Sequence, residues 1–155
     1  MASGESAYRE LKPIPQQDLH ACWALVKEGL KEVKEHSTQD WIAEDIYSAI
    51  RANSSWLYLG FVQHAYVGFC VLTPTVGYAC KMLHVWCVYS ATDLDVIALF
   101  SDELEKIARS IGAGKITFLS PRPGWERRLK GYGFRPGDTL YEKDVKCQVV
   151  ADLPM

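Results

Sequence analysis

The feature that most constrains the fold of this 155-residue chain is an amphipathic helix placed between two strand-like segments. The helix is predicted over residues 93–111, where apolar residues recur every three or four positions until Gly112 ends the pattern. A strand is predicted before it over 82–89, and a shorter strand after it over 115–119. A helix that connects two strands of one sheet makes a crossover, so these two strands are expected to be parallel.

The other predicted elements complete a mixed α/β sheet, mostly antiparallel, with helices on both faces. They are a strand over 8–14, a helix that begins after Asp18, a second helix capped by Thr38, strands over 56–62 and 66–72 joined by a turn at Gln63-His64, a helix over 125–130 and a strand over 139–145. Thr73-Pro74-Thr75 is expected to end the strand that precedes it. We expect one domain over 1–145 and a C-terminal extension over 146–155.

The strand over 82–89 is apolar on both sides, which is typical of a central strand covered by helices on both faces. Strict alternation predicts one face made of Leu83, Val85, Cys87 and Tyr89, and an opposite face made of Met82, His84, Trp86 and Val88.

Composition excludes several classes of protein. The chain is 48% hydrophobic and 23% charged, which favours a folded globular protein over a disordered one. Its net charge of −2 argues against a nucleic-acid or membrane-surface protein, and it has no apolar run long enough to span a bilayer. The N-terminus has no signal-peptide pattern, so we expect a cytoplasmic location. The five cysteines include no C-x-x-C pair, and Cys70 and Cys87 lie inside apolar runs, which predicts reduced, buried thiols. No metal site is expected.

Two stretches resemble the Gcn5-related N-acetyltransferase (GNAT) family. Residues 104–113 resemble its third helix running into its fifth strand, and Tyr132-Gly133-Phe134 followed by 140–145 resembles its last helix, Gly-Phe turn and sixth strand. The resemblance covers residues 8–145. It implies a GNAT fold and transfer of an acetyl group from acetyl-CoA to an amine.

The stretch that corresponds to the family's phosphate-binding loop departs from the family pattern. The family has glycines there that let backbone N–H groups reach the pyrophosphate of acetyl-CoA. Residues 90–97 contain no glycine and no basic residue, and Asp93 and Asp95 fall where the phosphates would lie. We expect Asp93 or Thr92 to cap the following helix instead. Leu129 stands where family members carry a tyrosine that protonates the departing thiolate.

The resemblance still indicates a set of site residues. The cofactor would be held at Val88, Tyr89, Ser90, Asp95 and Val96. His84 is the candidate base for the incoming amine, because a neutral imidazole is the most common base near pH 7. Tyr89 and His64 are further candidates. The alternative for His84 is a hydrogen-bonded residue of the core with no catalytic role.

A basic cluster lies near the C-terminus. Five basic residues and one acid fall between positions 122 and 135, close to the aromatic residues Trp125 and Tyr132. Three interpretations remain open: a solvated helix face, a docking surface for an acidic partner protein, or a contact with the phosphates of CoA or with nucleic acid. The predicted partner-binding residues are Arg122, Trp125, Arg127, Arg128 and Tyr132.

Two functions follow from these observations. In the first, the chain is a pseudoenzyme that no longer uses acetyl-CoA and binds a partner protein. It then resembles the short GNAT-like morphogenesis and virion-associated proteins of short-tailed bacteriophages, with a phage structural or host protein as its partner, in the host cytoplasm or the virion. In the second, it is a divergent N-acetyltransferase that uses acetyl-CoA and acts on an unknown amine. Neither involves a membrane or a metal, and nucleic acid is not an expected partner.

Overall fold

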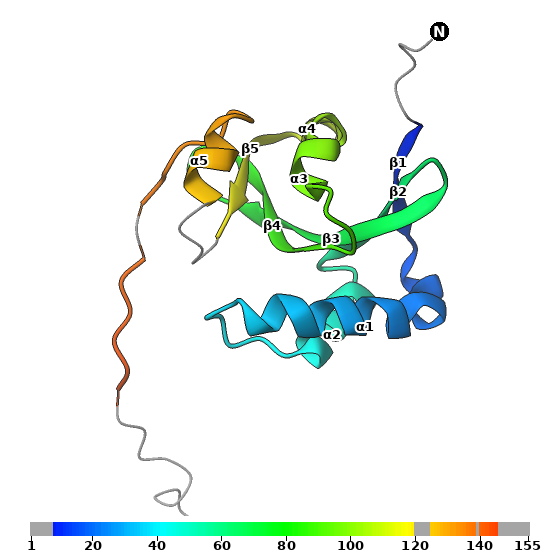
Figure 1. Ribbon diagram of the computed structural model, residues 1–155. Helices are drawn as coiled ribbons and strands as arrows, with labels where there is room; N and C mark the ends of the chain where they lie inside the picture. The colour runs from blue at the N-terminus through cyan, green and yellow to red at the C-terminus, as the bar shows by residue number, and fades with distance from the viewer. Residues whose placement is uncertain (1–7, 120–124, 139, 146–155) are drawn as a thin grey trace, which may run out of the picture.

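A single five-stranded sheet, with the strand order β1-β2-β3-β4-β5, organises the chain (Figure 1). The computed structural model describes residues 8–119, 125–138 and 140–145. The strands are β1 (Arg9–Ile14), β2 (Trp56–Val62), β3 (Ala65–Val76), β4 (Lys81–Ser90) and β5 (Ala113–Phe118). Neighbouring strands pair antiparallel, except β4 and β5, which are parallel. The predicted mixed and mostly antiparallel sheet is therefore confirmed.

Helices cover both faces of the sheet. The 3-10 helix η2 (Gln16–Asp18) leads into α1 (Leu19–Glu35) and α2 (Ala43–Arg51), which lie on one face. The short helix α3 (Val96–Leu99) and α4 (Ser101–Ser110) lie on the other face, and α5 (Trp125–Lys130) follows β5 (Figure 1). No helix in the described ranges has the length and apolarity needed to cross a bilayer.

Two main cores form between the sheet and these helices. The core under α1 and α2 consists of buried residues from both layers, among them Leu19, Val26, Leu30, Leu57, Phe69 and Val71. The core under α3 and α4 includes Leu72, Leu83, Val85, Ile97 and Leu104. Burial of apolar surface on both sides of the central strands is the main stabilising contribution in such a layered domain.

Glycine allows α1 to approach the sheet closely. A Cβ atom added to Gly29 would lie 2.5 Å from Cε2 of Phe69 and 2.7 Å from Cδ2 of Tyr89. Any larger residue at this position would overlap the aromatic side chains of β3 and β4. Gly29 thus sets the distance between α1 and the sheet at the C-terminal half of β4.

A β-bulge interrupts β4 at Trp86. Leu72 is opposite Val85 and Val71 is opposite Cys87, so Trp86 is an extra residue with no partner of its own in β3. Leu83 and Val85 pack in the core under α4, whereas Cys87 and Tyr89 pack on the α1 side. The prediction that Leu83, Val85, Cys87 and Tyr89 share one face is therefore wrong, because the bulge reverses the alternation.

Several predicted boundaries are also wrong. β3 continues through Pro74 to Val76. The pairing of β2 with β3 ends at Trp56↔Leu72, so no β2 residue lies opposite Pro74, and the N–H that proline lacks is not needed for a hydrogen bond on that side. Thr38 does not cap α2: the helix begins at Ala43, and the Asp45 carboxylate accepts a hydrogen bond from the N–H of Ile42 at 2.9 Å.

Two predicted elements in the C-terminal half of the chain also differ from the structure. The helix predicted over 93–111 is divided by the buried Phe100 into α3 and α4. The strand predicted over 139–145 is not formed at residues 140–145, which are exposed and extend away from the sheet (Figure 1). Thr139 lies outside the described residues. The helix predicted over 125–130 is confirmed with the bounds of α5.

Candidate functional site

The two parallel strands, the last pair at one edge of the described sheet, part halfway along β4. Pairing between β4 and β5 runs from Lys81↔Ala113 to Val85↔Phe118 and then ends. β4 continues to Ser90, paired with β3 along its other edge. In the described residues, no strand pairs with the β5-facing edge of this second half of β4. An extended ligand can therefore hydrogen-bond to that edge as an added strand would.

His84 lies one residue before the last pair of β4 and β5. Its Nδ1 atom is 2.8 Å from Oγ1 of Thr117, the residue paired with it on β5. Thr73 pairs with it on β3, and Oγ1 of Thr73 is 2.8 Å from Oγ of Ser55. A row of polar side chains thus crosses the sheet on the α1/α2 face. Burial lowers the pKa of His84, so the imidazole is neutral near pH 7 and can accept a proton.

Tyr89 also lies on the α1/α2 face, beyond the bulge. Its ring packs against Phe69 with a centroid distance of 5.4 Å, and its hydroxyl is on the side of the acidic residues Glu32 and Glu28 of α1. Burial, followed by the negative charges of Glu32 and Glu28, raises the pKa of Tyr89. The hydroxyl therefore stays protonated near neutral pH and serves as a donor rather than as a base.

The N-terminus of α3 is capped by its own chain. Oδ1 of Asp95 accepts a hydrogen bond from the N–H of Ala98 at 3.2 Å, and Oδ2 lies 2.6 Å from Nη2 of Arg128 on α5. Thr92 accepts a bond from the N–H of Leu94 at 3.1 Å, within the preceding loop. The prediction that Asp93 or Thr92 caps the helix is wrong, because the helix begins later than expected and Asp95 takes that position.

The other predicted cofactor-binding residues have different surroundings. Val88 and Val96 pack together with Val67 and Phe100 in a small apolar cluster on the α3 side. Ser90 is exposed at the end of β4, opposite Gly68. The fold brings together Val88, Val96 and Asp95, while the side chain of Tyr89 points to the opposite face. His64 lies in the turn between β2 and β3, where it stacks on Tyr8.

Part of the predicted partner-binding set lies on α5. Arg127 and Arg128 are exposed, and Tyr132 is 41% exposed just after the helix. Trp125 begins the helix, and its side chain, like the whole of Arg122, lies outside the described residues. Leu129, the residue in place of the family tyrosine, packs against the core under α4.

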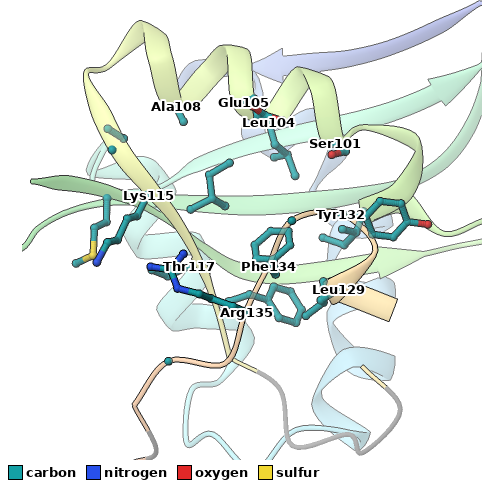
Figure 2. Close-up of a pocket in the computed structure, with 18 of the residues that line it drawn as sticks. Ser101, Leu104, Glu105, Ala108, Lys115, Thr117, Leu129, Tyr132, Phe134 and Arg135 are labelled. Carbon is teal, nitrogen blue, oxygen red and sulfur yellow. The ribbon is translucent and has the colours of Figure 1, made fainter. Parts of the chain in front are cut away.

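A cavity of about 1120 Å³ opens beside α5. It lies between α4, the outer side of β5 and the segment that follows α5. Figure 2 shows Leu104 and Ala108 of α4 on one side, and Leu129, Tyr132 and Phe134 on the other. Thr117, the hydrogen-bond partner of His84, also lines this cavity. Neither the cavity nor the role of Thr117 could be predicted from the sequence, because both depend on the register of β5.

Two of the cysteine thiols are deeply buried. Burial raises the pKa of Cys70 and of Cys87 to about 12, so both stay protonated and unreactive at neutral pH. Both belong to the cores, which confirms the prediction for these two residues. Within the described ranges, no three His, Cys, Asp or Glu side chains are grouped closely enough to hold a metal ion.

The fold is that of the GNAT acetyltransferases, which confirms the expected fold class. No protein-family model and no curated protein sequence matches the chain. Among solved structures, an aminoglycoside acetyltransferase from an uncultured soil metagenomic sample, in complex with sisomicin, is similar with a TM-score of 0.67 and 7% identity, over 91% of this chain and 97% of that one.

Two further structures show the same fold. A ribosomal-protein-alanine N-acetyltransferase from Brucella melitensis has a TM-score of 0.62 and 11% identity, over 90% of this chain and 99% of that one. A predicted acetyltransferase from Clostridium acetobutylicum, solved with acetyl-CoA, has a TM-score of 0.63 and 13% identity, over 88% of this chain and 96% of that one. At such identities the similarity establishes the fold and leaves the reaction to be argued from the site.

Proposed function

We propose that this protein is an N-acetyltransferase that uses acetyl-CoA and acts on a small or peptidic amine. The observation that carries the proposal is the parting of β4 and β5 directly after His84, a neutral histidine beside an open strand edge. The strand edge suits the extended amide-containing arm of CoA, because backbone groups can pair with its amides. The acetyltransferase folds of the similar structures support the same function.

The chain's own groups can support acetyl transfer. Acetyl-CoA would supply the acetyl group as a thioester. An amine must lose a proton when its nitrogen takes the acetyl group. In the tautomer in which Nδ1–H of His84 donates to Oγ1 of Thr117, Nε2 is the free acceptor for that proton. As the new C–N bond forms, the C–S bond breaks and CoA leaves with the electron pair. N–H groups on the open edge of β4 would stabilise the developing negative charge on the acetyl oxygen.

Turnover with a panel of amines tests the proposal. The panel contains an aminoglycoside, a peptide with N-terminal alanine and a polyamine, and release of the CoA thiol is measured. We expect turnover with at least one amine, and a loss of about 10²–10⁴-fold in kcat for His84→Gln. His64→Gln is the matched control, because it changes a histidine in the β2–β3 turn. No turnover by folded protein, or equal activity in His84→Gln, would contradict the proposal.

A second candidate function is favoured by one observation, the self-capped N-terminus of α3. Asp95 and its partner Arg128 fill the position where family members bind phosphates, which suits a protein that binds a partner without catalysis. The exposed cations of α5 then suit an acidic partner protein. A phage structural or host protein as that partner, and a location in the host cytoplasm or virion, remain predictions from the sequence resemblance.

Affinity purification separates the two functions. The tagged chain is compared with the double variant Arg127→Gln/Lys130→Gln in host lysate. Recovery of one acidic protein with the unchanged chain, and its loss with the double variant, would support the interaction protein. Equal recovery by both would exclude α5 as the docking surface.

A further inference from the structure

The outer edge of β5 is open. β5 is the last strand of the sheet, and within the described ranges no strand pairs with the edge that faces away from β4. The cavity of about 1120 Å³ lies between this side of β5, α4 and the segment that follows α5. Ile116 of β5 lines it, with Leu104 on one side and Leu129 and Phe134 on the other (Figure 2). An unpaired edge beside an apolar cavity can accept a further strand.

Residues 140–145 have the pattern of a strand but no sheet to join. They extend away from the sheet (Figure 1), and the side chains of Leu140, Tyr141 and Val145 are 70%, 89% and 82% exposed. In a strand, Tyr141 and Val145 would lie on one side, together with Lys143. Large apolar side chains are unfavourable in water, so a segment of this kind gains stability when it is covered.

The course of the chain favours a second copy as the occupant of the cavity. Residues 134–138 line the cavity without forming a helix or strand, and residues 140–145 then lead away from the cavity of their own copy (Figure 1). Pro136 keeps the backbone before it extended. Each copy has one open β5 edge and one free segment, so two copies related by a two-fold axis can satisfy each other completely.

The segment and the cavity also have complementary charges. If Tyr141 and Val145 enter the apolar side of the cavity, then Glu142 and Asp144 face the other side of β5, where Lys115 lies. Opposite charges on neighbouring strands favour their pairing. The charged residues that line the cavity have a net charge of +1, and residues 140–145 have a net charge of −1. The charged lining residues are Arg109, Lys115, Arg135, Glu105 and Asp138.

We propose that two copies of this chain exchange residues 140–145, and that the segment of each copy adds as a strand to the outer edge of β5 in the other. The backbone of β5 supplies hydrogen bonds to the added strand. Tyr141 and Val145 enter the partner's cavity, while Glu142 and Asp144 lie on the side of its Lys115. The cavity beside α5 is therefore complete only in the dimer. This inference concerns an interface and does not depend on acetyl transfer.

Sedimentation equilibrium of the full chain and two double variants tests the proposal. Tyr141→Asp/Val145→Asp places charges on the side of the segment that enters the cavity. Val76→Asp/Tyr78→Asp is the matched control, because it changes the same residue types at 83% and 114% exposure, and neither residue lines the cavity. All four side chains are exposed, so neither variant should unfold the chain.

The unchanged chain should have twice the mass of one copy. Tyr141→Asp/Val145→Asp should weaken self-association at least about 100-fold, because the dimer buries both side chains twice. Val76→Asp/Tyr78→Asp should leave it unchanged. A mixture of ¹³C-labelled and unlabelled chains then locates the strand. Isotope-filtered NOEs should connect residues 140–145 of one copy with residues 113–117 of the other.

Three results would overturn the proposal. They are a monomer at millimolar concentration of the unchanged chain, a dimer that persists in Tyr141→Asp/Val145→Asp, and NOEs found only within one copy. The third result would show that each chain covers its own β5 edge. None of the three bears on turnover of acetyl-CoA, so the proposed function succeeds or fails separately.

Discussion

The two faces of the sheet are built differently. On one face, the long helix α1 and its neighbour α2 pack over a continuous core, and Gly29 brings α1 into contact with the aromatic rings of β3 and β4. On the other face, α3, α4 and α5 are short, and an exposed ion pair joins two of them across the parting of β4 and β5.

This difference indicates that the α1/α2 face mainly stabilises the fold, whereas the α3/α5 face is available for binding. The α1/α2 face has tight packing that leaves little freedom for change, whereas the α3/α5 face has an open strand edge, a solvent-accessible ion pair and a cavity beside α5. His84 lies on the α1/α2 face of β4, next to the point where the pairing with β5 ends. Binding residues are expected where packing is loose and charges are accessible, held in place by a rigid layer behind them.

The largest loss of stability is expected from a substitution in the core under α1 and α2. Phe69 is fully buried in the α1 core, so Phe69→Ala should lower the free energy of unfolding by about 3–5 kcal/mol. Tyr78→Ala is the control of the same type, because Tyr78 is fully exposed and should change stability by about 0.5 kcal/mol at most. Urea denaturation measures both, and similar losses would show that the α1 core is not the main source of stability.

A smaller effect is expected from the contact between α1 and the sheet. Gly29→Ala should destabilise the protein by about 1–3 kcal/mol, because the added methyl group would overlap Phe69 and Tyr89. In an open helix the same change stabilises by roughly 1 kcal/mol. Gly137→Ala, where a Cβ would meet nothing within 4 Å, is the control. An increase in stability for Gly29→Ala would mean that α1 can shift away from the sheet.

Substitutions of Asp95 on the α3/α5 face should change the free energy of unfolding only slightly, by an amount that depends on the replacement residue. Asp95→Ala should cost about 1 kcal/mol, because it removes the N-cap acceptor of α3. Asp95→Asn should be nearly neutral, because it keeps the cap and removes an exposed charge pair. Equal losses for the two variants in urea denaturation would assign the stabilisation to the charge rather than to the cap.

The smallest effect concerns the pH dependence of stability. Burial lowers the pKa of His84 in the folded state, so the unfolded chain binds more protons between that pKa and the ordinary value near 6.5. Stability should therefore fall as the pH decreases through this window and be free of this penalty above it. Thermal unfolding of His84→Gln should show a shallower fall over the same range. An identical pH profile would mean that His84 is solvated.

The order of elements from β1 to α5 could largely be predicted from the sequence, because each element has its own periodicity. The strand over 56–62 and the helix over 125–130 have the predicted bounds. The division of the long helix at Phe100 could not be seen, because apolar residues continue at helical spacing through the break. The bulge at Trp86 could not be predicted for a similar reason. The strand is largely apolar on both sides, so its sequence does not show where the alternation reverses.

The residue types of the candidate site could be predicted from the sequence, but the contacts between these residues could not. His84 and Asp95 were identified from their chemistry and place in the pattern. Their partners Thr117 and Arg128 each lie 33 residues further along the chain, on elements whose register and orientation only the folded sheet defines. The sequence indicated a degenerate phosphate loop, and the structure shows a carboxylate with an arginine partner in that place.

The central claim is that the open edge of β4 beyond His84 binds acetyl-CoA. Hydrogen exchange of backbone amides, measured with and without acetyl-CoA, tests it most directly because it reports the position as well as the presence of binding. The account predicts slower exchange at residues 86–90 and around Asp95, with little change in α1. No change at saturating ligand, or protection confined to other parts of the sheet, would contradict it.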